Sequence, residues 1–198
     1  MKVQRGIELV ERIIERIEPH VTPVGADAST LDRLESKLMV ELPPTLRRFL
    51  EFDFTFASFG SRWQGRHRFG RVPGPTRPRE PRPKRTSIQK MAEAMTEYGS
   101  TNSRVRHRVV RLPNLPDEPW NCLYLGEARR DGELPILGLV NDETNVYAYV
   151  RYTAFDLYLV EQSGLLNLSE SMRLDDIDTM LSLNPELSTL VSIDDDDF

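Results

Sequence analysis

The chain has 198 residues, with 26 lysines and arginines against 31 acidic residues, 39% apolar residues, 14 prolines and one cysteine. This length and composition predict one soluble globular domain over residues 1–198. A single cysteine excludes an intramolecular disulfide and a cysteine-rich zinc site. Four glutamates among the first twenty residues argue against a targeting peptide, and no apolar run approaches the ~18 residues of a membrane span. We therefore expect a cytoplasmic protein without membrane contacts.

Three helices are expected before residue 53. The first spans 6–18, ends at Pro19, and carries an apolar stripe at helical spacing: Ile7, Val10, Ile14 and Ile17. The second begins with Ser29 as its N-cap and has Leu31, Leu34 and Leu38 on its apolar side. The third begins at Pro44, which suits the first helical position, and places Leu46, Phe49 and Leu50 in the core. The alternation of Phe52, Phe54 and Phe56 with polar residues then predicts a strand.

The charges are segregated along the chain. The stretch from Gly60 to Arg111 has 14 basic and three acidic residues, whereas the remaining residues include 12 basic and 28 acidic ones. Within it, residues 60–85 form a proline-rich insertion, here called the basic arm, with nine cations: Arg62, Arg66, Arg68, Arg71, Arg77, Arg79, Arg82, Lys84 and Arg85. Few apolar residues accompany them, so the sequence predicts a mobile, extended loop. The arm could contact nucleic acid, an anionic protein surface, or the acidic body of its own chain.

Order is expected to resume with a helix after Thr86 and a basic strand over 104–112. Three apolar segments, 120–125, 134–140 and 146–152, are joined by loops too short for helical crossovers. They predict a meander of antiparallel strands. A helix should follow from Thr153 or Ala154 to Gln162, ended by Gly164, and then short acidic helices and a solvated acidic tail at 192–198. The predicted fold class is α+β, with N-terminal and C-terminal helices packed on an antiparallel sheet.

Several short motifs resemble the SUKH superfamily, which is named in part for the yeast cell-wall assembly regulator. They are Leu34-Glu35, Leu42-Pro43 before a helix with Phe49-Leu50, Tyr124-Leu125-Gly126-Glu127, the strand end from Gly138 to Asp142, Asn145-Val146-Tyr147, and Ala154-Phe155. The resemblance covers residues 31–56 and 123–165. It implies an α+β fold and membership of a group that includes many bacterial immunity proteins of polymorphic toxin systems.

The sequence offers little that suggests catalysis. His20, His67 and His107 have no partner at helical spacing, so a metal site is not expected, and no phosphate loop or nucleophile motif is present. Cys122 lies in an apolar segment and should be a buried small side chain. The acidic pairs Asp117-Glu118, Asp142-Glu143 and Asp175-Asp176 fit turns and helix starts as readily as acid–base chemistry. We expect no cofactor and no enzymatic activity.

The expected function is therefore the one that the resemblance implies, an immunity protein that neutralises a cognate toxin by covering its active site. The acidic residues beside strand turns are the candidate contacts, together with one aromatic anchor: Asp117, Glu118, Trp120, Asp142 and Glu143. The alternative is a regulatory or nucleic-acid-binding adaptor that acts through the basic arm. A third candidate function is an unrecognised enzyme. A toxin gene next to this one would favour the immunity protein.

Overall fold

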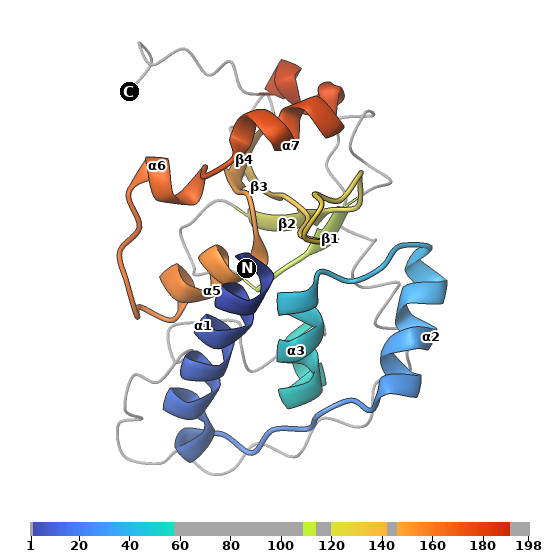
Figure 1. Ribbon diagram of the computed structural model, residues 1–198, viewed down its shortest axis with the longest axis vertical. Helices are drawn as coiled ribbons and strands as arrows, with labels where there is room; N and C mark the ends of the chain where they lie inside the picture. The colour runs from blue at the N-terminus through green and yellow to red at the C-terminus, as the bar shows by residue number, and fades with distance from the viewer. Residues whose placement is uncertain (1, 58–108, 114–119, 142–145, 191–198) are drawn as a thin grey trace.

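The computed structural model describes residues 2–57, 109–113, 120–141 and 146–190, and all structural statements below concern these residues. The basic arm, the helix expected after Thr86, the start of the basic strand and the acidic tail lie outside them. The described chain is mixed α and β, as expected from the sequence. It forms one four-stranded antiparallel sheet with helices on both faces (Figure 1).

The N-terminal helices follow the apolar spacing of the sequence. They are α1 (Lys2–Ile17), followed by the 3-10 turn η1 (Glu18–His20), α2 (Ala28–Leu38) and α3 (Pro44–Phe52). Val10, Ile14 and Ile17 of the expected stripe are buried and Ile7 is half-buried, while Ile13 adds a further wholly buried side chain. In Figure 1, α3 lies between α1 and α2. The three helices thus form a layer whose apolar sides meet at α3.

Two local predictions in this region are wrong. The N-cap of α2 is Asp27 and not Ser29: the Asp27 Oδ1 accepts a hydrogen bond from the Thr30 N–H at 2.8 Å. The strand expected over Phe52, Phe54 and Phe56 is also absent, because Phe52 ends α3 and residues Phe54–Ala57 form the 3-10 turn η2. The Asp53 carboxylate accepts bonds from both the N–H and the hydroxyl of Thr55, at 3.0 and 2.7 Å. This side-chain turn replaces the extended conformation that a strand requires.

The sheet is the predicted meander. Its strands are β1 (Val109–Arg111), β2 (Trp120–Tyr124), β3 (Ile136–Asn141) and β4 (Val146–Tyr152), and they pair in chain order. Leu123 pairs with Ile136, Leu137 with Val150, and a register shift follows Ile136. Gly132 has a positive φ of 81° in the Asp131-Gly132 turn of the β2–β3 connection. That backbone conformation favours glycine.

The sheet separates two apolar cores. One core joins its lower face in Figure 1 to α1, α2, α3 and the helix α5 (Phe155–Gln162), and includes Leu46, Phe49, Leu123, Tyr152 and Phe155. The other joins the opposite face to the C-terminal helices and includes Val109, Cys122, Tyr124, Leu137 and Leu187. Alternate strand residues face opposite sides of a sheet, so a single strand such as β2 supplies both cores. The buried position predicted for Cys122 is confirmed.

The C-terminal helices are short. They are α6 (Glu170–Arg173), α7 (Ile177–Leu183) and the 3-10 helix η3 (Pro185–Leu190). Leu174, Ile177 and Leu181, which recur at helical spacing, pack against the second core. Gly164 after α5 has a positive φ of 66°, as a helix-ending glycine often does. The sequence did not indicate α6. Within the described residues, no helix is both long enough and apolar enough to span a membrane.

Candidate functional site: a polar hub at the β2–β3 connection

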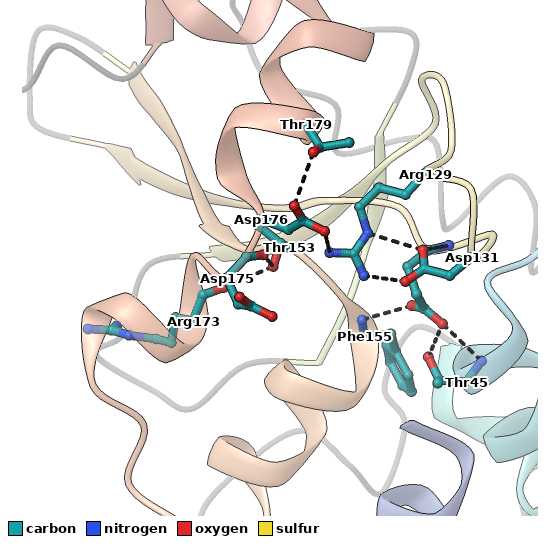
Figure 2. Close-up of polar contacts among 10 residues, drawn as sticks. Thr45, Arg129, Asp131, Thr153, Phe155, Arg173, Asp175, Asp176 and Thr179 are labelled. Carbon is teal, nitrogen blue, oxygen red and sulfur yellow. Dashed lines mark hydrogen bonds and ion pairs between the residues drawn. The ribbon is translucent and has the colours of Figure 1, made fainter. Parts of the chain in front are cut away.

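Several buried polar residues, among them Arg129, Glu133 and Asn184, make their contacts at the β2–β3 connection, residues 125–135. We call this connection and its partners the polar hub (Figure 2). At its start, the buried Asn184 side chain binds the backbone of Glu127 twice: its Oδ1 accepts from the Glu127 N–H at 2.7 Å and its Nδ2 donates to the carbonyl at 3.0 Å. This amide pairing fixes the connection against the turn between α7 and η3.

Glu133 is the buried centre of the polar hub. Its side chain comes from the β2–β3 connection, and the residue is only 2% exposed. Its Oε1 accepts from the Thr45 hydroxyl at 2.8 Å and from the Thr45 N–H at 3.3 Å, while Oε2 accepts from the Phe155 N–H at 3.2 Å. Both amides belong to first turns of helices, α3 and α5, whose N–H groups have no partner inside the helix. One carboxylate therefore holds two helix starts.

The electrostatics of Glu133 are unusual for a carboxyl group. Burial raises the pKa of Glu133 to about 7 from its ordinary value of 4.5, and the nearby charge of Asp156 adds to this, against the lowering effect of its hydrogen bonds. Asp156, in the first turn of α5, is half-buried, and burial also raises its pKa. Two carboxyl groups with raised pKa values are thus close enough for the charge of one to act on the other.

The cation of the polar hub is Arg129. It is 9% exposed and holds Asp131 with two hydrogen bonds, at 3.1 Å from Nε and 2.7 Å from Nη2. Its Nη1 lies 3.9 Å from the Oδ2 of Asp176. Asp176 is the N-cap residue of α7 with a φ of 68°, and its Oδ1 accepts from the Thr179 hydroxyl at 3.0 Å. Arg129 therefore joins the β2–β3 connection to the start of α7.

A second link from the same area holds the segment between α6 and α7. The Thr153 hydroxyl, after β4, donates to the carbonyl of Asp175 at 2.7 Å, and the Thr153 N–H donates to the carbonyl of Arg173 at 3.0 Å (Figure 2). Thr153 is wholly buried. The polar hub therefore connects the helical layer, the sheet and the C-terminal helices, which are far apart in the sequence.

The hub's chemistry favours a structural role for its carboxylates. A general base needs direct reach, or reach through one water, to the proton that it takes. A pKa near 7 would suit Glu133 for such work, but its oxygens face Thr45 and Phe155 inside the protein. In the described part of the chain, no group of three or more His, Cys, Asp or Glu residues is arranged to hold a metal ion.

The contact residues predicted from the sequence lie mostly outside the part of the chain that the structure describes. Asp117, Glu118, Asp142 and Glu143 lie outside the described residues, as does the whole basic arm, so these predictions remain open. Trp120 begins β2 and pairs with Leu139 of β3, and Asn141, at the end of β3, pairs with Val146. The strand ends that flank the two acidic pairs therefore lie at one end of the sheet, and the β2–β3 connection lies at the other.

Sequence reasoning named Glu127, Phe155 and Asp176 for other reasons, but it did not single out Thr45, Arg129 or Glu133 of the polar hub. Glu133 lies 88 residues from Thr45 and 22 from Phe155, and no spacing rule connects such positions. The only sequence signal is a glutamate placed between the Asp131-Gly132 turn and the apolar run that leads into β3. His20 lies exposed in η1. Asp175 and Asp176 directly precede α7, with Asp176 at the N-cap, as the helix-start interpretation of that acidic pair expects.

Comparison with protein-family models, with curated proteins and with solved structures finds no match for this chain.

Proposed function

We propose that the protein is a SUKH-like immunity protein that binds a cognate bacterial toxin and neutralises it by covering its active site. The supporting observation is where the motif residues lie. The Glu35 carboxylate accepts from the Leu42 N–H at 2.9 Å and from Arg47 at 2.8 Å, so Leu34-Glu35 is joined to Leu42-Pro43. Gly126-Glu127 meets Asn184, and Ala154-Phe155 meets Glu133. Because residues of these motifs make contacts that hold the fold together, they support the proposal that the fold is SUKH-like.

On this proposal the partner surface is the end of the sheet with the acidic pairs. The strand pairing of β2 with β3 and of β3 with β4 supports one continuous surface there, to which Asp117, Glu118, Trp120, Asp142 and Glu143 would contribute. Acidic residues at such a surface would speed association with a basic toxin, because complementary charges steer the encounter. The motif residues in the interior would serve the fold, which leaves the turns to vary with the toxin.

The test is co-expression with the toxin encoded beside this gene, read out by growth rescue and by pull-down. The double variant Asp142→Lys with Glu143→Lys should weaken binding at least tenfold and reduce rescue. Its matched control is Glu127→Lys, an exposed acid at the opposite end of the sheet, which should leave both unchanged. Failure of the pair to associate, together with steeply salt-dependent binding of RNA by the purified protein, would instead favour the adaptor that acts through the basic arm.

A further inference from the structure

The helix α1 lies directly against Asp156 and Thr45 of the polar hub. A Cβ atom placed on Gly6 would lie 2.9 Å from the Cγ2 of Thr45 and 3.1 Å from the Oδ2 of Asp156. Thr45 in turn donates its hydroxyl proton to Glu133 at 2.8 Å. The backbone of α1 at Gly6 therefore lies close to Asp156 and to Thr45, the residue that binds Glu133. We call Glu133 and Asp156 together the carboxyl pair.

The charges around the carboxyl pair are unbalanced. The charges that act on Asp156 come from Arg129 and Asp131 of the β2–β3 connection. Asp176, before α7, lies 3.9 Å from the remaining side-chain nitrogen of Arg129, Nη1. The residues that face the pair from α3 and α1 are Thr45 and Gly6, which carry no charge. Arg129 already binds Asp131 through two hydrogen bonds. Full ionisation of the pair would thus add two negative charges near a guanidinium group that is already paired with Asp131.

We propose that the carboxyl pair is a proton-linked contact for α1. While the pair binds one proton, the first turns of α1 pack against it, and loss of that proton to solvent loosens these turns. The reason is hydration. With one proton the pair carries one negative charge; loss of that proton adds a second charge that needs water, and the backbone at Gly6 lies against the Oδ2 of Asp156. From Val10 onward, wholly buried residues such as Ile13 hold α1 in the core. The movement is therefore confined to the residues before Val10.

The pH range follows from the direction of the shifts. The pKa of Glu133 is raised to about 7, above the 4.5 expected in an unfolded chain, and that of Asp156 is also raised. At pH values between the unfolded and the native pKa of Glu133, the native protein binds more protons than the unfolded chain. The pair therefore contributes stability at low pH that is lost as the pH rises toward 7. The α1 contact should weaken over the same range and stay weak above it.

The experiment is an NMR titration of the full chain between pH 4.5 and 8.5. The side-chain carboxyl carbon of Glu133 and the amides of Gly6, Thr45 and Phe155 should titrate together with a midpoint near 7, and the heteronuclear NOE of Gly6 should fall on the alkaline side. Glu127→Gln is the matched control, because Glu127 lies in the same connection with an exposed side chain. It should leave the titration unchanged.

Two variants separate the proton from the packing. Asp156→Asn keeps the contacts of Glu133 but removes the second charge, so the Glu133 midpoint should fall by about one pH unit and the Gly6 NOE should become independent of pH. Glu133→Gln should abolish the titration of Thr45 and Phe155 and flatten the dependence of unfolding free energy on pH. A Glu133 midpoint below 5 in the wild-type protein, or a Gly6 NOE that is constant across the titration, would overturn the proposal.

Discussion

Gly126 is required by the close approach of two neighbours. A methyl group at this position would overlap both the Oδ1 of Asn184 and the ring of Tyr124, and these two residues are buried. Asn184 also binds Glu127, so it cannot turn away without losing two hydrogen bonds. We expect Gly126→Ala to lower the free energy of unfolding by ~1–3 kcal/mol, as overpacked interiors do. Urea unfolding followed by circular dichroism measures this.

The control for that variant is Gly164→Ala. Gly164 has a φ of 66°, and a Cβ there would have no neighbour within 4 Å, so the change adds backbone strain alone. Its expected cost is ~1–2 kcal/mol, without any change in the resonances of Glu127. Gly126→Ala should shift those resonances strongly. An undisturbed Glu127 in Gly126→Ala would mean that the amide pairing with Asn184 does not fix the connection.

The environment of a single side chain could be predicted from the sequence only where it is determined by residues nearby in the chain. The burial of Cys122 was predictable, because its strand neighbours are apolar. Glu133 was not, because its environment comes from Thr45 and Phe155 on two other elements. The pKa of such a group depends on burial, and burial is a property of the folded chain and not of a sequence window.

Two residues before or at the start of α2, Asp27 and Ser29, could each act as its N-cap. Asp27 accepts from the Thr30 N–H, and the Ser29 hydroxyl donates to the same Asp27 oxygen at 3.0 Å. We therefore expect Asp27→Ala to reduce the thermal stability and the amide protection of residues 28–31. Asp27→Asn should retain the cap, because an asparagine side chain also accepts this bond. Hydrogen exchange measured by NMR distinguishes the variants.

Ser29→Ala is the counterpart that decides between the two caps. It removes a hydroxyl that supports Asp27 but leaves the Thr30 N–H bonded, so its effect should be the smaller one. If Ser29→Ala costs more protection than Asp27→Ala, the helix begins at the serine. Hydrogen bonding to Thr30 also lowers the pKa of Asp27, so the contribution of this cap is present above the ordinary carboxyl range and is lost as the pH falls through it.

The elements that sequence patterns predicted correctly are those whose partners lie nearby in the chain. The meander of β2, β3 and β4 needs only short loops and alternating residues. The three phenylalanines at 52, 54 and 56 alternate in the same way, yet Phe56 packs edge-on against Phe49 at 4.9 Å between ring centroids. A 3-10 turn buries Phe56 as well as a strand would, and the Asp53 side-chain turn decides between them. Five residues are too few for periodicity alone to separate these cases.

The whole described chain is built as two cores that share the sheet, and Cys122 reports on the smaller one. Its side chain lies with Tyr124 and Leu187 between the sheet and the C-terminal helices. Leu187→Ala should lower the unfolding free energy by ~2–5 kcal/mol and increase the rate at which a thiol reagent labels Cys122 under native conditions. Leu46→Ala, a wholly buried leucine of the other core, is the matched control.

At equal loss of global stability, Leu187→Ala should label faster than Leu46→Ala, because the C-terminal layer then opens before the rest of the molecule. Equal labelling rates would show that the two cores unfold as one unit. The comparison needs only urea unfolding curves and a colorimetric thiol assay, since the chain has one cysteine.

The contact between α1 and α5 also sets an order of events during synthesis. The first helix packs on α3 and on α5, which extends to Gln162. While the ribosome makes the intervening residues, the apolar face that includes Val10 and Ile13 has only part of its final cover. Until α5 leaves the exit tunnel, part of this face is therefore uncovered and open to chaperones. The packing of α5 on α1 then completes its cover.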